Sequence, residues 1–190
     1  MSAPIPDATG ATDATEARGP LDDLPGDLMI WVLIVSELLV FGAGLLGFLG
    51  ARIGDPAGFA EAAARLHPVR AGIGTMVLVS SGALAAIGNI RGGRWLIAAA
   101  ALGSVFIGLK WAEWSDLAGA GIDTETHAFF TFYYLLTGFH AAHVAAGIVL
   151  LALVAWLRRE RETEAAVAFW HMVDLVWVLL YPVIYLMGTL

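Results

Sequence analysis

Long apolar runs separated by short polar stretches are the dominant pattern of this chain. Five runs are long enough to cross a membrane, because about 20 residues at a rise of ~1.5 Å per residue span a ~30 Å hydrocarbon core. The predicted helices cover residues 28–50, 71–90, 95–114, 128–157 and 165–190. The predicted fold class is therefore all-α: a polytopic membrane protein with five transmembrane helices in one bundle.

The segments outside these runs have a different composition. Residues 1–27 are rich in Pro, Gly, Ala, Thr and Asp, and they carry six acidic residues against Arg18. A secretory signal needs a basic region before its apolar core, so we predict a disordered acidic tail instead. Residues 28–190 form the predicted membrane domain. Asp55-Pro56 predicts a short surface helix after the first run, which Pro68 ends.

The amino-acid composition excludes several classes of function. The chain of 190 residues is 59% hydrophobic and only 14% charged, with a mean hydropathy of +0.77. It has no cysteine, which excludes disulfides, iron–sulfur clusters and thiolate metal sites. The net charge of −7 comes mainly from the tail. With no basic surface, we predict no nucleic-acid partner.

The distribution of arginine predicts an orientation. One side of the membrane receives Arg18, Arg91, Arg94, Arg158, Arg159 and Arg161, and the other receives Arg52, Arg65 and Arg70. Positively charged loops are enriched on the cytoplasmic side. The N-terminus is therefore predicted to be cytoplasmic and the C-terminus periplasmic, since five spans place the two ends on opposite sides.

Small residues recur at a spacing that lets helices approach closely. The pairs are Ala43 and Gly47, Ser81 and Ala85, and Ala141 and Ala145. This spacing indicates helix–helix contacts, although it does not identify the partner of each pair.

Ionisable side chains inside the apolar runs are the candidate functional residues: Glu37, His140, His143, His171 and Asp174. Each ionised group costs roughly 2.5–3.5 kcal/mol at a helix centre, so such residues usually face protein and usually have partners. A second group, Lys110 and Glu113, lies toward the end of the third run. We predict that these two form a polar pair near the membrane interface.

The depths of these residues allow a shared layer. Glu37 and Asp174 each lie about ten residues into helices that run the same way, while His140 and His143 lie near the middle of the fourth helix. All four can meet in one polar layer. His171 shares a helix face with Asp174, and Tyr181 and Tyr185 extend that face.

Several interpretations of this layer remain open. His140 and His143 can be interhelical hydrogen-bonding groups, which is the commoner role of membrane histidines. A haem site needs histidines on two helices at one depth, as His143 and His171 can offer. A zinc or copper site needs more ligands, of which Asp174 is a candidate. Glu37 is either a neutral, hydrogen-bonded acid or, together with Asp174, part of a proton path.

Five motifs go beyond these physical patterns, and they occur in order along the five predicted helices. They are "SELLVFG" (36–42), "GTMVLVSSGALA" (74–85), "GLKWAEW" (108–114), "TGFHAAHVAAG" (137–147) and "FWHMVDLVWVLLYPVIYLMG" (169–188). Together they resemble the cytochrome c oxidase subunit III family over residues 26–190. The fourth motif, with its G-x-H-x-x-H-V pattern, is the most diagnostic.

The resemblance implies a role for the buried polar residues. In that family the matching residues belong to a subunit that carries neither haem nor copper, so no cofactor-binding or metal-binding residues are predicted in this chain. Glu37, His140, His143, His171 and Asp174 would be buried hydrogen-bonding groups that fix helix packing, with Glu37 the first candidate for a functional role. Haem and metal would lie in a partner, the catalytic membrane subunit, and membrane lipids would surround both in a bacterial inner membrane.

The chain also departs from the seven-helix form of the family, since it lacks the first two helices. Five-helix members include subunit III of quinol oxidases and an accessory protein of bacterial nitric oxide reductase. The segments "KWAEW", "FYYLLTGFH" and "WHMVDLVW" resemble the second group more closely. We therefore predict a non-catalytic accessory subunit of nitric oxide reductase. The alternatives are subunit III of a terminal cytochrome c or quinol oxidase, and a small haem-binding or proton-conducting membrane protein.

Overall fold

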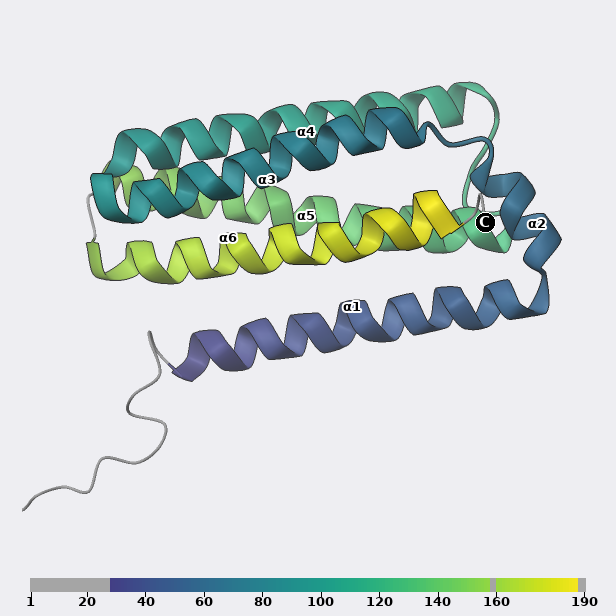
Figure 1. Ribbon diagram of the computed structural model, residues 1–190, viewed down its shortest axis with the longest axis horizontal. Helices are drawn as coiled ribbons and strands as arrows, with labels where there is room; N and C mark the ends of the chain where they lie inside the picture. The colour runs from purple at the N-terminus through teal and green to yellow at the C-terminus, as the bar shows by residue number, and fades with distance from the viewer. Residues whose placement is uncertain (1–27, 158–159, 188–190) are drawn as a thin grey trace, which may run out of the picture.

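The computed structural model describes residues 28–157 and 160–187, and this part of the chain is built from helices (Figure 1). The elements are α1 (Leu28–Gly54), α2 (Pro56–Ala63), α3 (Pro68–Arg91), α4 (Gly93–Gly119), α5 (Ala128–Leu157), α6 (Glu160–Tyr181) and a π-helical turn, η1 (Pro182–Leu186). Five of them are long and apolar enough to cross a membrane: α1, α3, α4, α5, and α6 with η1. The predicted all-α, five-span fold is confirmed. The predicted disordered tail, residues 1–27, lies outside the described residues.

Asp55 and Pro56 begin the short helix α2 as predicted, but that helix ends at Ala63, before Pro68. Asp55 caps α2 by accepting a hydrogen bond from the Gly58 amide at 3.0 Å, and Pro56 begins that helix. This bond and the contact with His127 lower the pKa of Asp55. Pro68 begins α3. Gly92, with a φ of +99°, makes the sharp turn between α3 and α4.

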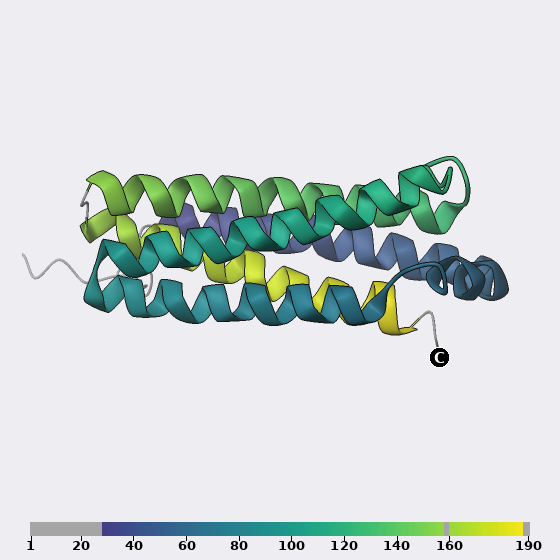
Figure 2. The same ribbon diagram turned by 90° about the horizontal axis from the view of Figure 1, so that it is seen from above.

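The long helices lie roughly parallel or antiparallel to one another (Figure 2). The α3–α4 turn is at one end of the bundle, and α2 and the α4–α5 loop are at the other end (Figure 2). Arg91 and Arg94 flank that turn, whereas Arg52 ends α1 at the opposite end. These described arginines thus lie at the two ends to which the sequence assigns them, while Arg18, Arg158 and Arg159 lie outside the described residues.

The contact between α3 and α4 has the small-residue character that the sequence predicts. Ser81 and Ala85 are fully buried, and the Ser81 hydroxyl donates a hydrogen bond across to the Ala99 carbonyl at 2.7 Å. On α5 the prediction was half right, because Ala141 is buried while Ala145 is exposed. The buried small residue in the second half of α5 is Gly147 instead.

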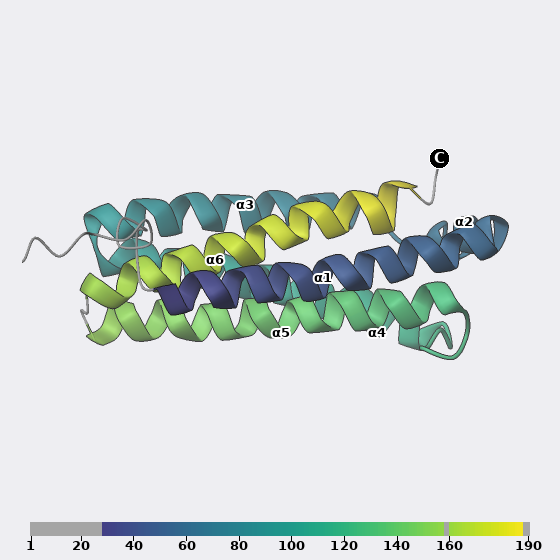
Figure 3. The same cartoon turned by 90° about the horizontal axis from the view of Figure 1, so that it is seen from below.

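α1 packs less closely than the other helices. It runs along α5 and α6 on one side of the bundle (Figures 1 and 3). Only 17% of its most apolar segment is buried, compared with 50% for α6. Large apolar side chains remain exposed along it, among them Val32, Val35, Leu39, Leu46 and Ile53. These faces require lipid or another membrane protein to cover them.

Candidate functional site

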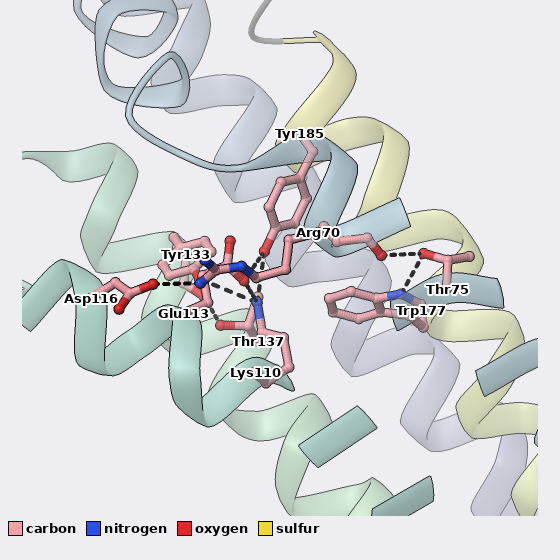
Figure 4. Close-up of polar contacts among 10 residues, drawn as sticks. Arg70, Thr75, Lys110, Glu113, Asp116, Tyr133, Thr137, Trp177 and Tyr185 are labelled. Atoms are coloured by element: carbon pink, nitrogen blue, oxygen red, sulfur yellow. Dashed lines mark hydrogen bonds and ion pairs between the residues drawn. The ribbon is translucent and has the colours of Figure 1, made fainter. Parts of the chain in front are cut away.

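A buried ion pair on α4 is the centre of the polar network. Lys110 and Glu113 are three residues apart, so they share one face of the helix. The Lys110 Nζ lies 2.7 Å from the Glu113 Oε2, and each side chain is about 97% buried, with exposed fractions of 4% and 3%. Figure 4 shows the pair between α4, α5 and the end of α6. The charges are thus held inside the protein rather than against lipid.

Two tyrosines complete the network from the neighbouring helices. The Lys110 ammonium donates to the Tyr185 hydroxyl at 2.6 Å and to the Tyr133 hydroxyl at 3.2 Å. Tyr185 in turn donates to the Glu113 carboxylate at 2.9 Å. The Lys110 Nζ also lies 4.9–5.9 Å from four aromatic ring centroids, those of Trp114, Tyr133, Trp177 and Tyr185. The single cation therefore joins α4, α5, α6 and η1 through hydrogen bonds and cation–π contacts.

The position of Tyr185 depends on a departure from regular α-helix. α6 ends at Tyr181 and continues as the π-helical turn from Pro182 to Leu186, which contains Tyr185. Proline has no amide hydrogen to donate, so the regular hydrogen-bond ladder cannot pass through Pro182. Such π turns often occur at functional sites. Here the turn carries the tyrosine that contacts both charges of the pair.

The sequence predicted Lys110 and Glu113 as a polar pair, and the two side chains do form one. The prediction missed that protein side chains enclose them on every side. Position along a helix indicates membrane depth, but it does not indicate which neighbouring helix covers that face. Tyr133 was absent from the prediction, and Tyr185 entered it only as part of the polar face of the last helix.

A second, exposed ion pair lies beyond the buried one, where Arg70 of α3 contacts Asp116 of α4 (Figure 4). Between them and the membrane centre, the Trp177 indole N–H donates to the Thr75 hydroxyl at 2.9 Å. That hydroxyl donates to the Ala71 carbonyl one turn earlier at 3.0 Å. These contacts fix α3 against α4 and α6 near the same end of the bundle.

Glu37 and His143 form a separate pair between α1 and α5. The Glu37 Oε2 lies 3.1 Å from the His143 Nε2, and the side chains are 24% and 15% exposed. The carboxylate oxygen lies off the line of an N–H bond, so the contact is electrostatic rather than a well-aligned hydrogen bond. It gives the loosely packed α1 a polar attachment to the rest of the bundle.

The other ring nitrogen of His143 limits where protons can lie. The His143 Nδ1 donates to the Phe139 carbonyl at 2.9 Å, and a carbonyl oxygen can only accept. Nδ1 therefore carries a proton.

We expect the Glu37–His143 contact to contribute a modest stabilisation. In a double-mutant cycle with Glu37→Gln and His143→Gln, the coupling should be about 0.6 kcal/mol and at most ~1.7 kcal/mol, as for other polar contacts in membrane proteins. The measurement is the free energy of unfolding in mixed micelles. The control cycle pairs Glu37→Gln with His171→Gln, which should be additive. Equal coupling in both cycles would show that the contact contributes nothing specific.

His140 has a different environment from His143, although the two are three residues apart. Its ring is fully buried and stacks on Trp177, with ring centroids 5.0 Å apart and planes at 28°. Phe106 and Phe41 contact its edges. Neither ring nitrogen has a hydrogen-bond partner within the described residues. The prediction that His140 is a hydrogen-bonding group is therefore wrong, and the ring packs as an aromatic side chain.

His171 and Asp174 lie on the face of α6 that meets α3. A Cβ atom at Gly82 of α3 would overlap the Asp174 carboxylate and lie 3.6 Å from the His171 Nδ1. Asp174 is 9% exposed, and its Oδ1 has no hydrogen-bond partner in the described part of the chain. His171 is exposed. Gly82 thus provides the space for the buried carboxyl group.

Within the described residues, these candidate side chains do not join into one connected network. Glu37 and His143 face each other between α1 and α5, His140 is enclosed by aromatic rings, and Asp174 faces Gly82 on α3. His143 and His171, the two candidate haem ligands, also point in different directions: His143 faces α1 and His171 faces α3. Across residues 28–157 and 160–187, no three His, Asp or Glu side chains come together in a metal-binding arrangement.

The fold and these contacts define a multi-pass helical membrane protein whose buried polar groups join helices to one another. Comparison with known proteins adds the family. The sequence model of the family described as "Cytochrome c oxidase subunit III" matches residues 27–189. The chain belongs to this family, as its five ordered motifs suggested.

Individual relatives agree with this assignment. The chain is 30% identical to cytochrome c oxidase subunit 3 of Thermostichus vulcanus, over 84% of this chain and 86% of the relative. It is 35% identical to cytochrome bo(3) ubiquinol oxidase subunit 3 of Pseudomonas aeruginosa, over half of each chain. It is 27% identical to heme-copper oxidase subunit I+III of Aeropyrum pernix, over 83% of this chain and 22% of that longer protein.

Proposed function

We propose that this chain is subunit III of a terminal haem–copper oxidase that uses cytochrome c or a quinol. It would be a non-catalytic subunit that supports the assembly, stability or sustained turnover of the haem-bearing subunit. The observation that carries the proposal is the family match over residues 27–189. The long alignment with a cytochrome c oxidase subunit 3 and the shorter one with a ubiquinol oxidase subunit 3 support both donor classes.

A lateral contact with the haem-bearing subunit is part of the proposal. The Aeropyrum pernix relative is named as subunit I+III, so in that protein the two subunits share one chain. In the present chain, exposed apolar residues line α1, α3 and α5, and each of these faces suits helix packing within the bilayer. The proposed location is the inner membrane of a bacterium, with the N-terminus in the cytoplasm.

The association with nitric oxide reductase, which three sequence segments favoured, remains a prediction. The relatives described above are all named for oxidases, and they favour the oxidase alternative. Deletion of the chain distinguishes an oxidase partner from a nitric oxide reductase partner, because different substrates are then consumed more slowly.

Deleting the chain should lower sustained oxygen consumption by the host membranes while the initial rate per haem is retained. The measurement follows oxygen consumption with reduced cytochrome c and with a quinol, and nitric oxide consumption in parallel. Loss confined to nitric oxide consumption would instead support the reductase partner. Unchanged rates in all three assays would contradict an accessory role.

In-membrane crosslinking tests the contact directly. A photoreactive side chain would replace Leu39 on α1, Met76 on α3 or Leu135 on α5, all of which are exposed. At least one position should crosslink to a haem-bearing polypeptide. Leu78 is the control, because it is 1% exposed on the same helix as Met76. Crosslinks only between copies of this chain would contradict the proposal.

A further inference from the structure

A hollow of about 1040 Å³ lies at the end of the bundle that contains the α3–α4 turn. Residues of that turn, of the first part of α4 and of the last part of α5 line it. Its described lining includes Ile90, Arg91, Arg94, Ile97 and Trp156, together with Thr163 of α6. The polar network described above lies toward the other end of α4, so this hollow is a separate feature.

Glycines let the backbone beside the hollow pack closely against its neighbours. A Cβ atom at Gly93 would lie 3.0 Å from the Ala155 carbonyl oxygen of α5, and one at Gly88 would lie 2.5 Å from Leu96. Gly92 adopts a φ of +99°, which other residues rarely adopt. The turn therefore approaches α5 closely while leaving open space outside it.

The charged residues of the hollow's described lining are two arginines. Arg91 and Arg94 are both exposed and both line it. Neither makes an ion pair with a carboxylate of the described residues. The Arg94 guanidinium lies 5.7 Å from the centroid of the Trp95 ring. The described lining contains no acidic residue, although Glu162 and Glu164 flank Thr163 in the sequence. An anion is the ligand that such a lining favours.

Apolar side chains border the same two arginines. Ile90 and Trp156 are 85% and 80% exposed, and Ile97 is 49% exposed. All three line the hollow, where helices long enough to cross a membrane end. Tryptophan at such an end typically lies at headgroup level. A small free anion would use the arginines but would leave these apolar side chains uncovered.

We propose that this hollow binds the headgroup of an anionic phospholipid. Arg91 and Arg94 would donate to the phosphate oxygens, for which the guanidinium fork is well suited. Ile97 and Trp156 would contact the glycerol and the upper acyl chains. Basic pockets between transmembrane helices recognise such headgroups by this combination of charge and apolar surface. The predicted orientation places the site at the cytoplasmic leaflet. The proposal does not depend on which oxidase the chain serves.

Lipid binding to the purified, delipidated full-length chain tests the proposal, with native mass spectrometry as the readout. The probes are phosphatidylglycerol and phosphatidylcholine with the same acyl chains. We expect the Arg91→Gln/Arg94→Gln variant to bind phosphatidylglycerol about 25-fold more weakly than the wild type, from about 5-fold per arginine near a membrane surface. Arg52→Gln is the matched control, because Arg52 lies at the opposite end of the bundle, and it should leave the affinity unchanged.

A lysine variant and competition by inorganic phosphate distinguish binding of a lipid from binding of a free anion. Arg91→Lys/Arg94→Lys keeps the charge and should retain most of the binding, while circular dichroism checks that each variant is folded. Inorganic phosphate at millimolar concentration should fail to displace the lipid, because it cannot cover the apolar border. Full displacement by phosphate would overturn the lipid assignment. Equal affinity for phosphatidylcholine, or equal affinity of the wild type and the double glutamine variant, would overturn the site itself.

Discussion

Replacing Lys110 with Met should lower the free energy of unfolding by about 3–5 kcal/mol, the usual effect of removing one partner from a buried ion pair. The change leaves the Glu113 carboxylate enclosed without its cation. It also removes the hydrogen bonds that the ammonium donates to Tyr133 and Tyr185. The measurement is denaturant titration in mixed micelles, followed by tryptophan fluorescence.

The loss of stability in Lys110→Met depends on the burial of the ion pair. A second, exposed ion pair serves as the control for burial. Arg70 and Asp116 form an ion pair near the same end of the bundle, but their side chains are 39% and 55% exposed. Arg70→Met should therefore cost at most about 1 kcal/mol. If the Lys110 and Arg70 variants lose similar stability, the buried network is not what joins these helices.

The double variant Lys110→Met/Glu113→Leu supplies a further test. Removing both charges eliminates the unpaired carboxylate, and apolar replacements of a buried pair are often neutral or stabilising. The double variant should therefore be more stable than Lys110→Met alone. A double variant that is less stable than either single variant would indicate that Glu113 has a favourable interaction independent of Lys110.

The positions of the helices could be predicted from hydrophobic runs, but their ends only in part. The predicted limits of α5, 128 and 157, agree with the structure. α4 extends beyond its apolar run through Asp116 to Gly119, and α1 extends to Gly54. Hydropathy indicates where a helix can be surrounded by lipid. A helix can continue past that limit, because its backbone hydrogen bonds do not depend on lipid. It stops where the backbone departs from helical geometry, as at Gly92 after α3.

The candidate residues were identified correctly as polar groups in apolar helices, but their partners could not be predicted. Residues three apart on a helix differ by about 60° in direction. That difference places the His143 ring against Glu37 of α1 and the His140 ring against Trp177 of α6. The rotation of each helix in the bundle decides such contacts, and it results from packing of the whole chain.

The contact between Lys110 and Tyr185 was beyond prediction for another reason. The two residues are 75 positions apart, and Tyr185 lies in the π-helical turn after Pro182. Regular helical periodicity would place it in a different direction. Pro182 indicates that α6 cannot continue as a regular helix, but it does not indicate the direction of the side chains that follow it.

Gly147→Ala should lower the free energy of unfolding by about 1–3 kcal/mol, the usual cost of overfilling a packed interior. Trp170 of α6 is fully buried between α4 and α5. A Cβ atom at Gly147 would lie 2.5 Å from one side of its indole ring, and a Cβ atom at Gly103 would lie 2.6 Å from the other. The two glycines thus form a slot for the ring, and an added methyl group on either one must displace it.

The control for this change is Gly138→Ala on the same helix. A Cβ atom at Gly138 meets nothing within 4 Å, so this variant should be neutral or gain up to about 1 kcal/mol from the higher helix propensity of alanine. The smaller ring of Trp170→Phe should relieve the overlap, so its combination with Gly147→Ala should cost less than the sum of the two single changes. If Gly147→Ala behaves like Gly138→Ala, or if the Phe replacement brings no relief, then α5 and α6 do not approach as closely as the structure shows.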